Sequence, residues 1–159
     1  MNVQHLGIYI NDHFAGSLAA VELLNHLISA KTGVPGDQLL FGLREEIEQD
    51  RAVLRGLLQQ LDFKESPIRK AVAWCSEKFA RAKLFLEDPT HSKLARLELL
   101  EALALGIEGK RALWSALEIV GEQTSALQSL DFSTLKRKAK DQRQRVEAVR
   151  LDAAREALL

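Results

Sequence analysis

The stretch of sequence that decides the fold is LARLELLEALALGIEGKRALWSALEIV, residues 94–120. Its apolar residues recur at spacings of three and four, which is the period of an α-helix. Charged residues interrupt it every few positions, so it is too polar at its centre to cross a membrane. It is nevertheless apolar around most of its circumference, and such a helix must be covered on several sides. The stretch therefore predicts a long helix inside a helical bundle.

The sequence on both sides of this stretch has the same helical spacing. It predicts four more helices, at about residues 6–30, 37–61, 67–88 and 131–159. Asp37 can cap the second of them, Ser66-Pro67 is a strong start signal for the third, and Asp131 or Ser133 can cap the last. No run alternates between apolar and polar residues for long enough to form a strand. We therefore expect an all-α protein.

The composition fits one soluble domain spanning residues 1–159. A mass of 17.8 kDa lies within the range that a single hydrophobic core serves. The 22 Lys and Arg residues balance the 22 Asp and Glu residues, whereas dedicated nucleic-acid binders are usually basic. The one cysteine, Cys75, excludes an intramolecular disulfide and suits a reducing compartment, and no secretory signal is recognisable. These features predict a cytoplasmic protein with no membrane span.

Short loops connect the first helix to the second and the fourth to the fifth, so each pair should form an antiparallel hairpin. If residues 67–88 carry the chain back along the bundle, the helices at 37–61 and 92–120 run parallel. In this connectivity the chain resembles the ferritin-like superfamily. The resemblance implies a ferritin-like antiparallel four-helix bundle with an additional crossover helix between the second and third long helices. An ordinary five-helix up-and-down bundle would give the same sequence pattern.

The resemblance invites a test for metal ligands. Ferritin-like carboxylate proteins hold two metal ions with an inward Glu on two helices and a Glu-x-x-His motif on each of the other two. This sequence contains no Glu-x-x-His, and Asp88-x-x-His91 falls in the predicted loop around Pro89. Glu22 and His26 lie off the apolar line of the first helix. We therefore expect no metal centre and no cofactor.

Polar side chains interrupt the apolar line of each long helix near its middle. A carboxylate or an ammonium group buried alone is very costly, so the charged ones must be paired or must reach water. We expect Lys110 to pair with Asp50, supplying the positive charge that metal ions supply in metal-binding relatives. The arrangement is either a structural polar network or a small polar pocket in which His13 titrates near neutral pH. The candidate residues are His13, Ser17, Glu46, Asp50, Lys110 and Gln142.

Residues 136–145 contain six basic side chains and one acidic side chain. They could contact nucleic-acid phosphates, but no aromatic residue lies among them to stack on bases. The basic side chains could instead pair with the acidic run of Glu45, Glu46, Glu48 and Asp50, within the chain or between subunits. We therefore expect charge pairing within the protein or its assembly, and no nucleic-acid binding.

Gly106 and Gly109 lie near the middle of the helix at 94–120, where glycine lowers helix propensity. They make sense where another helix approaches closely. The apolar circumference of the same helix must be covered by residues 67–88 or by a second subunit, and we expect a homodimer.

These features predict a non-catalytic helical interaction or assembly protein without a di-metal site, and no catalytic residue is assigned. One alternative is a small-ligand-binding or enzymatic bundle that uses the polar pocket. Another is a ferritin-like metal-binding oxidoreductase with atypical ligands such as Glu46, Asp50, Glu101 and Glu108. The partner or ligand is unknown in each case.

Overall fold

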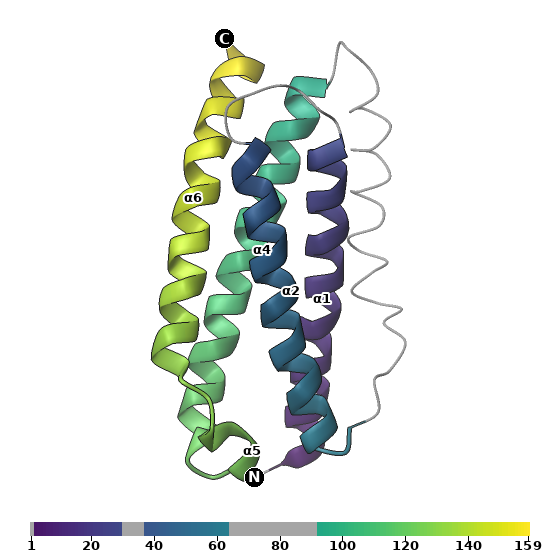
Figure 1. Cartoon of the computed structure of the whole chain (residues 1–159), viewed down its shortest axis with the longest axis vertical. Coiled ribbons are helices and arrows are strands. Elements are labelled where there is room, and N and C mark those ends of the chain that lie inside the picture. The colour runs from purple at the N-terminus through teal and green to yellow at the C-terminus, as the bar shows by residue number, and fades with distance from the viewer. Residues whose placement is uncertain (1, 30–36, 64–91) are drawn as a thin grey trace.

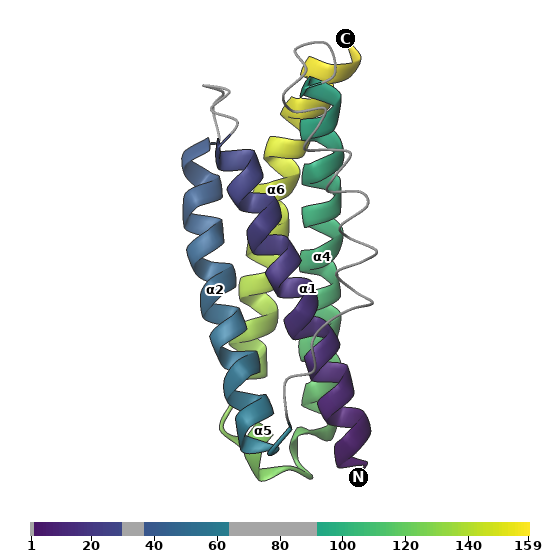
Figure 2. The ribbon, with the colours of Figure 1, turned by 90° about the vertical axis from the view of Figure 1, so that its right-hand side faces the viewer.

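The computed structural model describes residues 2–29, 37–63 and 92–159. Within these ranges every regular element is a helix: α1 (Val3–Ser29), α2 (Asp37–Gln60), α4 (Ser92–Gly121), α5 (Ser125–Gln128) and α6 (Phe132–Leu158). The four long helices lie side by side and form a bundle (Figures 1 and 2). The prediction of an all-α fold with four long helices is confirmed. The predicted helix at 67–88 and its Ser66-Pro67 start lie outside the described residues, as do Cys75 and the predicted capping side chain of Asp37.

The four long helices form two antiparallel hairpins, α1 with α2 and α4 with α6. In Figure 1, α1 and α6 run away from the end of the bundle that holds the N-terminus, whereas α2 and α4 run toward it. The closest pairings are α4 with α6 and α1 with α2, and α1 also packs against α4. The C-terminal end of α2 and the N-terminal end of α4 lie at opposite ends of the bundle, so these two helices run parallel (Figure 1).

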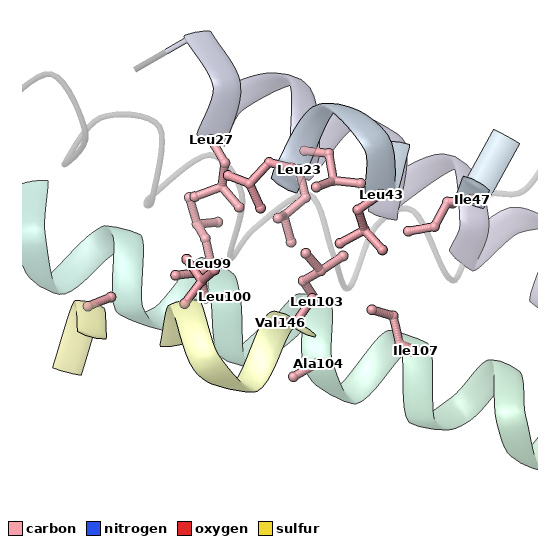
Figure 3. Close-up of a cluster of buried hydrophobic side chains, with 14 of the residues drawn as sticks. Leu23, Leu27, Leu43, Ile47, Leu99, Leu100, Leu103, Ala104, Ile107 and Val146 are labelled. Atoms are coloured by element: carbon pink, nitrogen blue, oxygen red, sulfur yellow. The ribbon is translucent and has the colours of Figure 1, made fainter. Parts of the chain in front are cut away.

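Two apolar clusters fill the interior. The first draws on all four long helices and includes Leu23, Leu43, Leu100, Leu103 and Val146, which converge in Figure 3. The second surrounds the fully buried Trp114 near the α5 end and also includes residues of α5. Burial of apolar side chains contributes roughly 1.5–3 kcal/mol each, so these clusters stabilise the bundle.

Local hydrogen bonds set the helix ends. The side chain of Asn2 accepts a hydrogen bond from the His5 amide at 3.0 Å, so α1 begins at Val3, three residues before the predicted start. The side chain of Asp131 accepts from the Thr134 amide at 3.0 Å, which confirms the predicted N-cap of α6. The one-turn helix α5 was not predicted from the sequence.

The residues that follow α2 contact the N-terminal part of α1. Asp62 has a φ of 50°, and the Phe63 amide donates to the Leu58 carbonyl at 2.9 Å, which is the hydrogen bond of a Schellman motif. The Phe63 ring then lies beside Gly7, where an added Cβ would approach Phe63 Cδ2 to 2.2 Å. Gly7 is therefore required for this close contact between α1 and a residue that follows the end of α2.

Candidate functional site

The polar side chains singled out in the sequence fall between the two apolar clusters. On α2 the first cluster ends at Ile47 and the second begins at Leu54, and Asp50 lies between them. On α4 and α6, Lys110 and Gln142 occupy the corresponding intervals. We call the connected group the polar layer. It consists of Glu46 and Asp50 from α2, Lys110 from α4, and Lys138, Gln142 and Arg145 from α6.

Lys110 is the central cation of the polar layer. Its Nζ donates to Asp50 Oδ2 at 2.5 Å and to Gln142 Oε1, so it links α4 to both α2 and α6. The side chains of Lys110 and Asp50 are only 12% and 4% exposed. Burial lowers the pKa of Lys110 below its ordinary value, and the neighbouring Asp50 carboxylate opposes that change. The predicted pairing of Lys110 with Asp50 is therefore present, and it is largely shielded from water.

Gln142 is completely buried and bridges the two carboxylates. Its Nε2 donates to Glu46 Oε2 at 2.9 Å and to Asp50 Oδ2 at 3.4 Å, while its Oε1 accepts from Lys110. Each polar atom of the Gln142 amide thus has a partner, as a buried amide requires. Because its amide has both a donor and an acceptor, Gln142 connects the Lys110 ammonium group to the carboxylates of Glu46 and Asp50.

Glu46 is held at the edge of the polar layer by Arg145. The guanidinium group of Arg145 donates to Glu46 Oε2 at 2.5 Å. Burial alone would raise the pKa of Glu46, but the hydrogen bonds from Arg145 and Gln142 outweigh it and lower that pKa overall. Glu46 therefore stays ionised and fixes α2 to α6.

Lys138 completes the polar layer and was not among the candidates chosen from the sequence. Its Nζ donates to Asp50 Oδ1 at 3.0 Å and to Gln49 Oε1 at 3.2 Å. Lys138 and Arg145 both belong to the basic run at 136–145, and Asp50 and Glu46 belong to the acidic run of α2. The predicted pairing of these two runs thus occurs within the chain, between α6 and α2.

The polar layer contains more positive than negative charge. Three cationic side chains surround two carboxylates, and both Asp50 oxygens and Glu46 Oε2 already accept hydrogen bonds from them or from Gln142. A metal ion prefers free carboxylate oxygens and is repelled by adjacent ammonium groups. In the ranges 2–29, 37–63 and 92–159, no three His, Cys, Asp or Glu side chains gather in a group able to hold a metal ion.

His13 and Ser17 have other surroundings. The Ser17 hydroxyl donates to the Phe14 carbonyl of its own helix at 2.5 Å. The His13 ring meets the Tyr9 ring edge-on, with the centroids 4.8 Å apart. Burial lowers the pKa of His13, and Asp12 partly offsets that effect. No hydrogen bond among the described residues joins either side chain to the polar layer, so the predicted constellation divides into a connected group of four and two separate residues.

Glu101 and Glu108, the other two carboxylates considered as atypical metal ligands, lie on the surface. Glu101 pairs with Arg150 at 3.3 Å, and Glu108 accepts from Arg111 Nε at 2.9 and 3.1 Å. Neither reaches the polar layer. A surface hollow lies on α1 and α2 and is lined by Val21, Asn25, Arg44, Glu45, Glu48 and Gln49. His13, Asp50 and Lys110 are not among its lining residues.

The helices of the described ranges include none with the length and apolar character needed to cross a membrane. Comparisons of the chain with models of known protein families, with curated proteins and with solved structures give no match.

Proposed function

We propose that the protein is a non-catalytic, ferritin-like helical bundle that acts as an interaction or assembly protein and has no di-metal site. The topology supports the ferritin-like part of the proposal, because α2 and α4 run parallel and each belongs to an antiparallel hairpin (Figure 1). The observation that carries the functional part is the contact of the Lys110 ammonium group with Asp50 and Gln142 at mid-height.

Mid-height in the core is where ferritin-like carboxylate proteins place their metal ions. Here the Lys110 ammonium group lies between the side chains of α2 and α6, and Lys138 and Arg145 neutralise the outer carboxylate oxygens. A divalent ion entering this layer would have to displace a buried ammonium group and would still face two further cations. The layer is therefore suited to holding helices together and poorly suited to metal chemistry.

Because the two apolar clusters and the polar layer fill the interior, a partner protein would bind at the outer surface. Large apolar side chains are exposed there. Within the described helices the most exposed of them are Leu105 and Ile119 of α4, at 74% and 80%. Exposed apolar side chains that gather on one face are typical of protein–protein contacts.

Elemental analysis of the protein purified without chelators tests the proposal. We expect no stoichiometric iron, manganese or zinc, and no rise in the melting temperature when each ion is added in excess, because a ligand bound to the native state would raise it. Stoichiometric metal, or a saturable rise in melting temperature that Asp50→Asn abolishes, would contradict the proposal. That result would support the metal-binding oxidoreductase with Glu46 and Asp50 as atypical ligands.

A further inference from the structure

We propose that the outward face of α4 is a self-association surface that pairs two copies of this chain antiparallel, about a two-fold axis that passes between Gly109 and Ala112. The inference rests on the proposed function and gives it a partner, a second copy of the chain. We call the surface the α4 stripe. It consists of Ala102, Leu105, Gly109, Ala112, Ala116 and Ile119.

The α4 stripe follows the spacing of a coiled-coil seam. Its positions are separated alternately by three and four residues, as are the a and d positions of a heptad, so they form one line along the helix. From Leu105 to Ile119 this line lies opposite the buried side of α4, which faces α1 and α6 with Leu103, Ile107 and Trp114. Ala102, at one end of the line, is partly buried against the first apolar cluster. Leu105 and Ile119 mark its outer part with 74% and 80% exposure.

None of the described residues outside α4 covers the centre of the stripe at Gly109. A Cβ added at Gly109 would meet no heavy atom within 4 Å, and the same holds for the adjacent Gly106. The close helix approach expected at these glycines is therefore absent within the described part of the chain. Glycine costs a helix roughly 1 kcal/mol relative to alanine. On the stripe, the missing side chain of Gly109 leaves room for a second helix to approach.

The order of residue sizes along the stripe indicates a second copy. In antiparallel pairing about the midpoint, each of the six positions meets another stripe position. Leu105 faces Ala116 of the other copy, Ile119 faces Ala102, and Gly109 faces Ala112. Each large side chain thus meets an alanine, and the two smallest residues meet where the helices approach most closely. A surface that is complementary to itself in this way forms an isologous two-fold interface.

The charges beside the stripe are compatible with this pairing. Glu101 and Glu108 lie along one edge, and each is neutralised within its own copy, by Arg150 and Arg111 respectively. The contact therefore depends on apolar packing, and added salt should not dissociate it. From 102 to 119 the stripe is about 26 Å long. One helix pair of this length buries less than the roughly 800 Å² per partner of a standard interface, so we expect a concentration-dependent dimer.

Light scattering across a concentration series from about 1 μM to 1 mM tests the surface. We expect the wild-type mass to rise from 17.8 kDa toward twice that value. Leu105→Glu should hold the mass at the monomer value, because it would place a carboxylate against Ala116 of the other copy. Leu151→Glu is the matched control, since Leu151 is an exposed leucine on α6 and should leave the mass series unchanged.

Cysteine cross-linking tests the register. In a Cys75→Ser background, Leu105→Cys and Ala116→Cys should form a covalent dimer only when the two variants are mixed and oxidised. Pairing about the midpoint brings position 105 to position 116 and keeps like positions far beyond disulfide reach. Cross-linking of either variant with itself, or no cross-linking in the mixture, would overturn the antiparallel register.

The outcomes separate this inference from the proposed function. A wild-type mass that stays at 17.8 kDa throughout, or a dimer that Leu105→Glu leaves intact, would overturn the α4 stripe as a self-association surface and leave the metal-free interaction protein standing. Stoichiometric metal would overturn the proposed function whatever the mass.

Discussion

Gly7 and Gly16 both lie in α1, but an alanine would meet different surroundings at each. An added Cβ at Gly7 would lie 2.2 Å from the Phe63 ring, whereas at Gly16 it would meet no heavy atom within 4 Å. Gly16→Ala should gain about 1 kcal/mol of stability from helix propensity. Gly7→Ala should fall short of that gain by about 1–3 kcal/mol, since it overpacks the contact. Urea unfolding of both variants measures the difference, and equal stabilities would contradict the close contact of α1 with Phe63.

At the scale of single residues, a member of the polar layer can be identified from the sequence when it is a polar residue within the line of apolar residues along its helix. Asp50, Lys110 and Gln142 lie within such lines, and the cost of burying a charge alone predicts their pairing. Lys138 and Arg145 cannot be identified in this way, because they lie beside the apolar line and reach the layer with long, partly exposed side chains. His13 and Ser17 lie on the line, but one packs against Tyr9 and the other bonds to its own helix.

At the scale of an element, α6 carries a surface ion cluster around Glu147. Arg150 and Arg143 donate to the Glu147 carboxylate and lower its pKa to about 2. A carboxyl group whose pKa is lower in the folded than in the unfolded state adds stability above its ordinary pKa of 4.5, and this stability is lost as the pH falls toward 2.

Glu147→Gln should therefore destabilise the protein at pH 7, by less than about 1 kcal/mol because the pairs are solvent-exposed. The difference from the wild type should shrink steadily between about pH 4.5 and pH 2. Urea unfolding at several pH values provides the measurement, and Gln144→Glu, which changes an exposed neighbour on the same helix, controls for net charge. A difference that stays constant across this pH range would contradict the role of Glu147.

Helix boundaries were predictable where a cap or an apolar period marks them. Asp131 caps α6 as expected, because a short acidic side chain precedes a long helical pattern. The apolar period places the start of α1 too late, because the apolar line begins at Leu6, whereas the side chain that caps the helix is that of Asn2. The helix α5 has only four residues, which is too short to show a period, although its Leu127 is fully buried.

At the scale of the whole molecule, the helix directions follow from short loops, but the way the two hairpins meet does not. The α1–α2 and α4–α6 hairpins pack closely, as do α1 and α4, whereas α2 and α6 are joined through long polar side chains. The apolar period of a helix does not show whether its neighbour packs closely or lies farther away. Long lysine and arginine side chains can connect two helices that do not pack closely, as Lys138 and Arg145 connect α6 to α2. The central claim is thus that the buried Lys110–Asp50 pair helps to hold the two hairpins together.

A double-mutant cycle of Lys110→Met and Asp50→Leu, measured by denaturant unfolding, tests this claim most directly. Lys110→Met removes one partner of a buried pair and should cost about 3 kcal/mol, the lower end of the usual range, because Asp50 keeps Lys138 as a partner. The double variant should recover much of that loss, since it replaces both charges by apolar groups of similar size. We predict a coupling energy above 1 kcal/mol, as expected for residues in contact. Single-variant effects below about 1 kcal/mol that add within about 0.5 kcal/mol would contradict the pair and the account built on it.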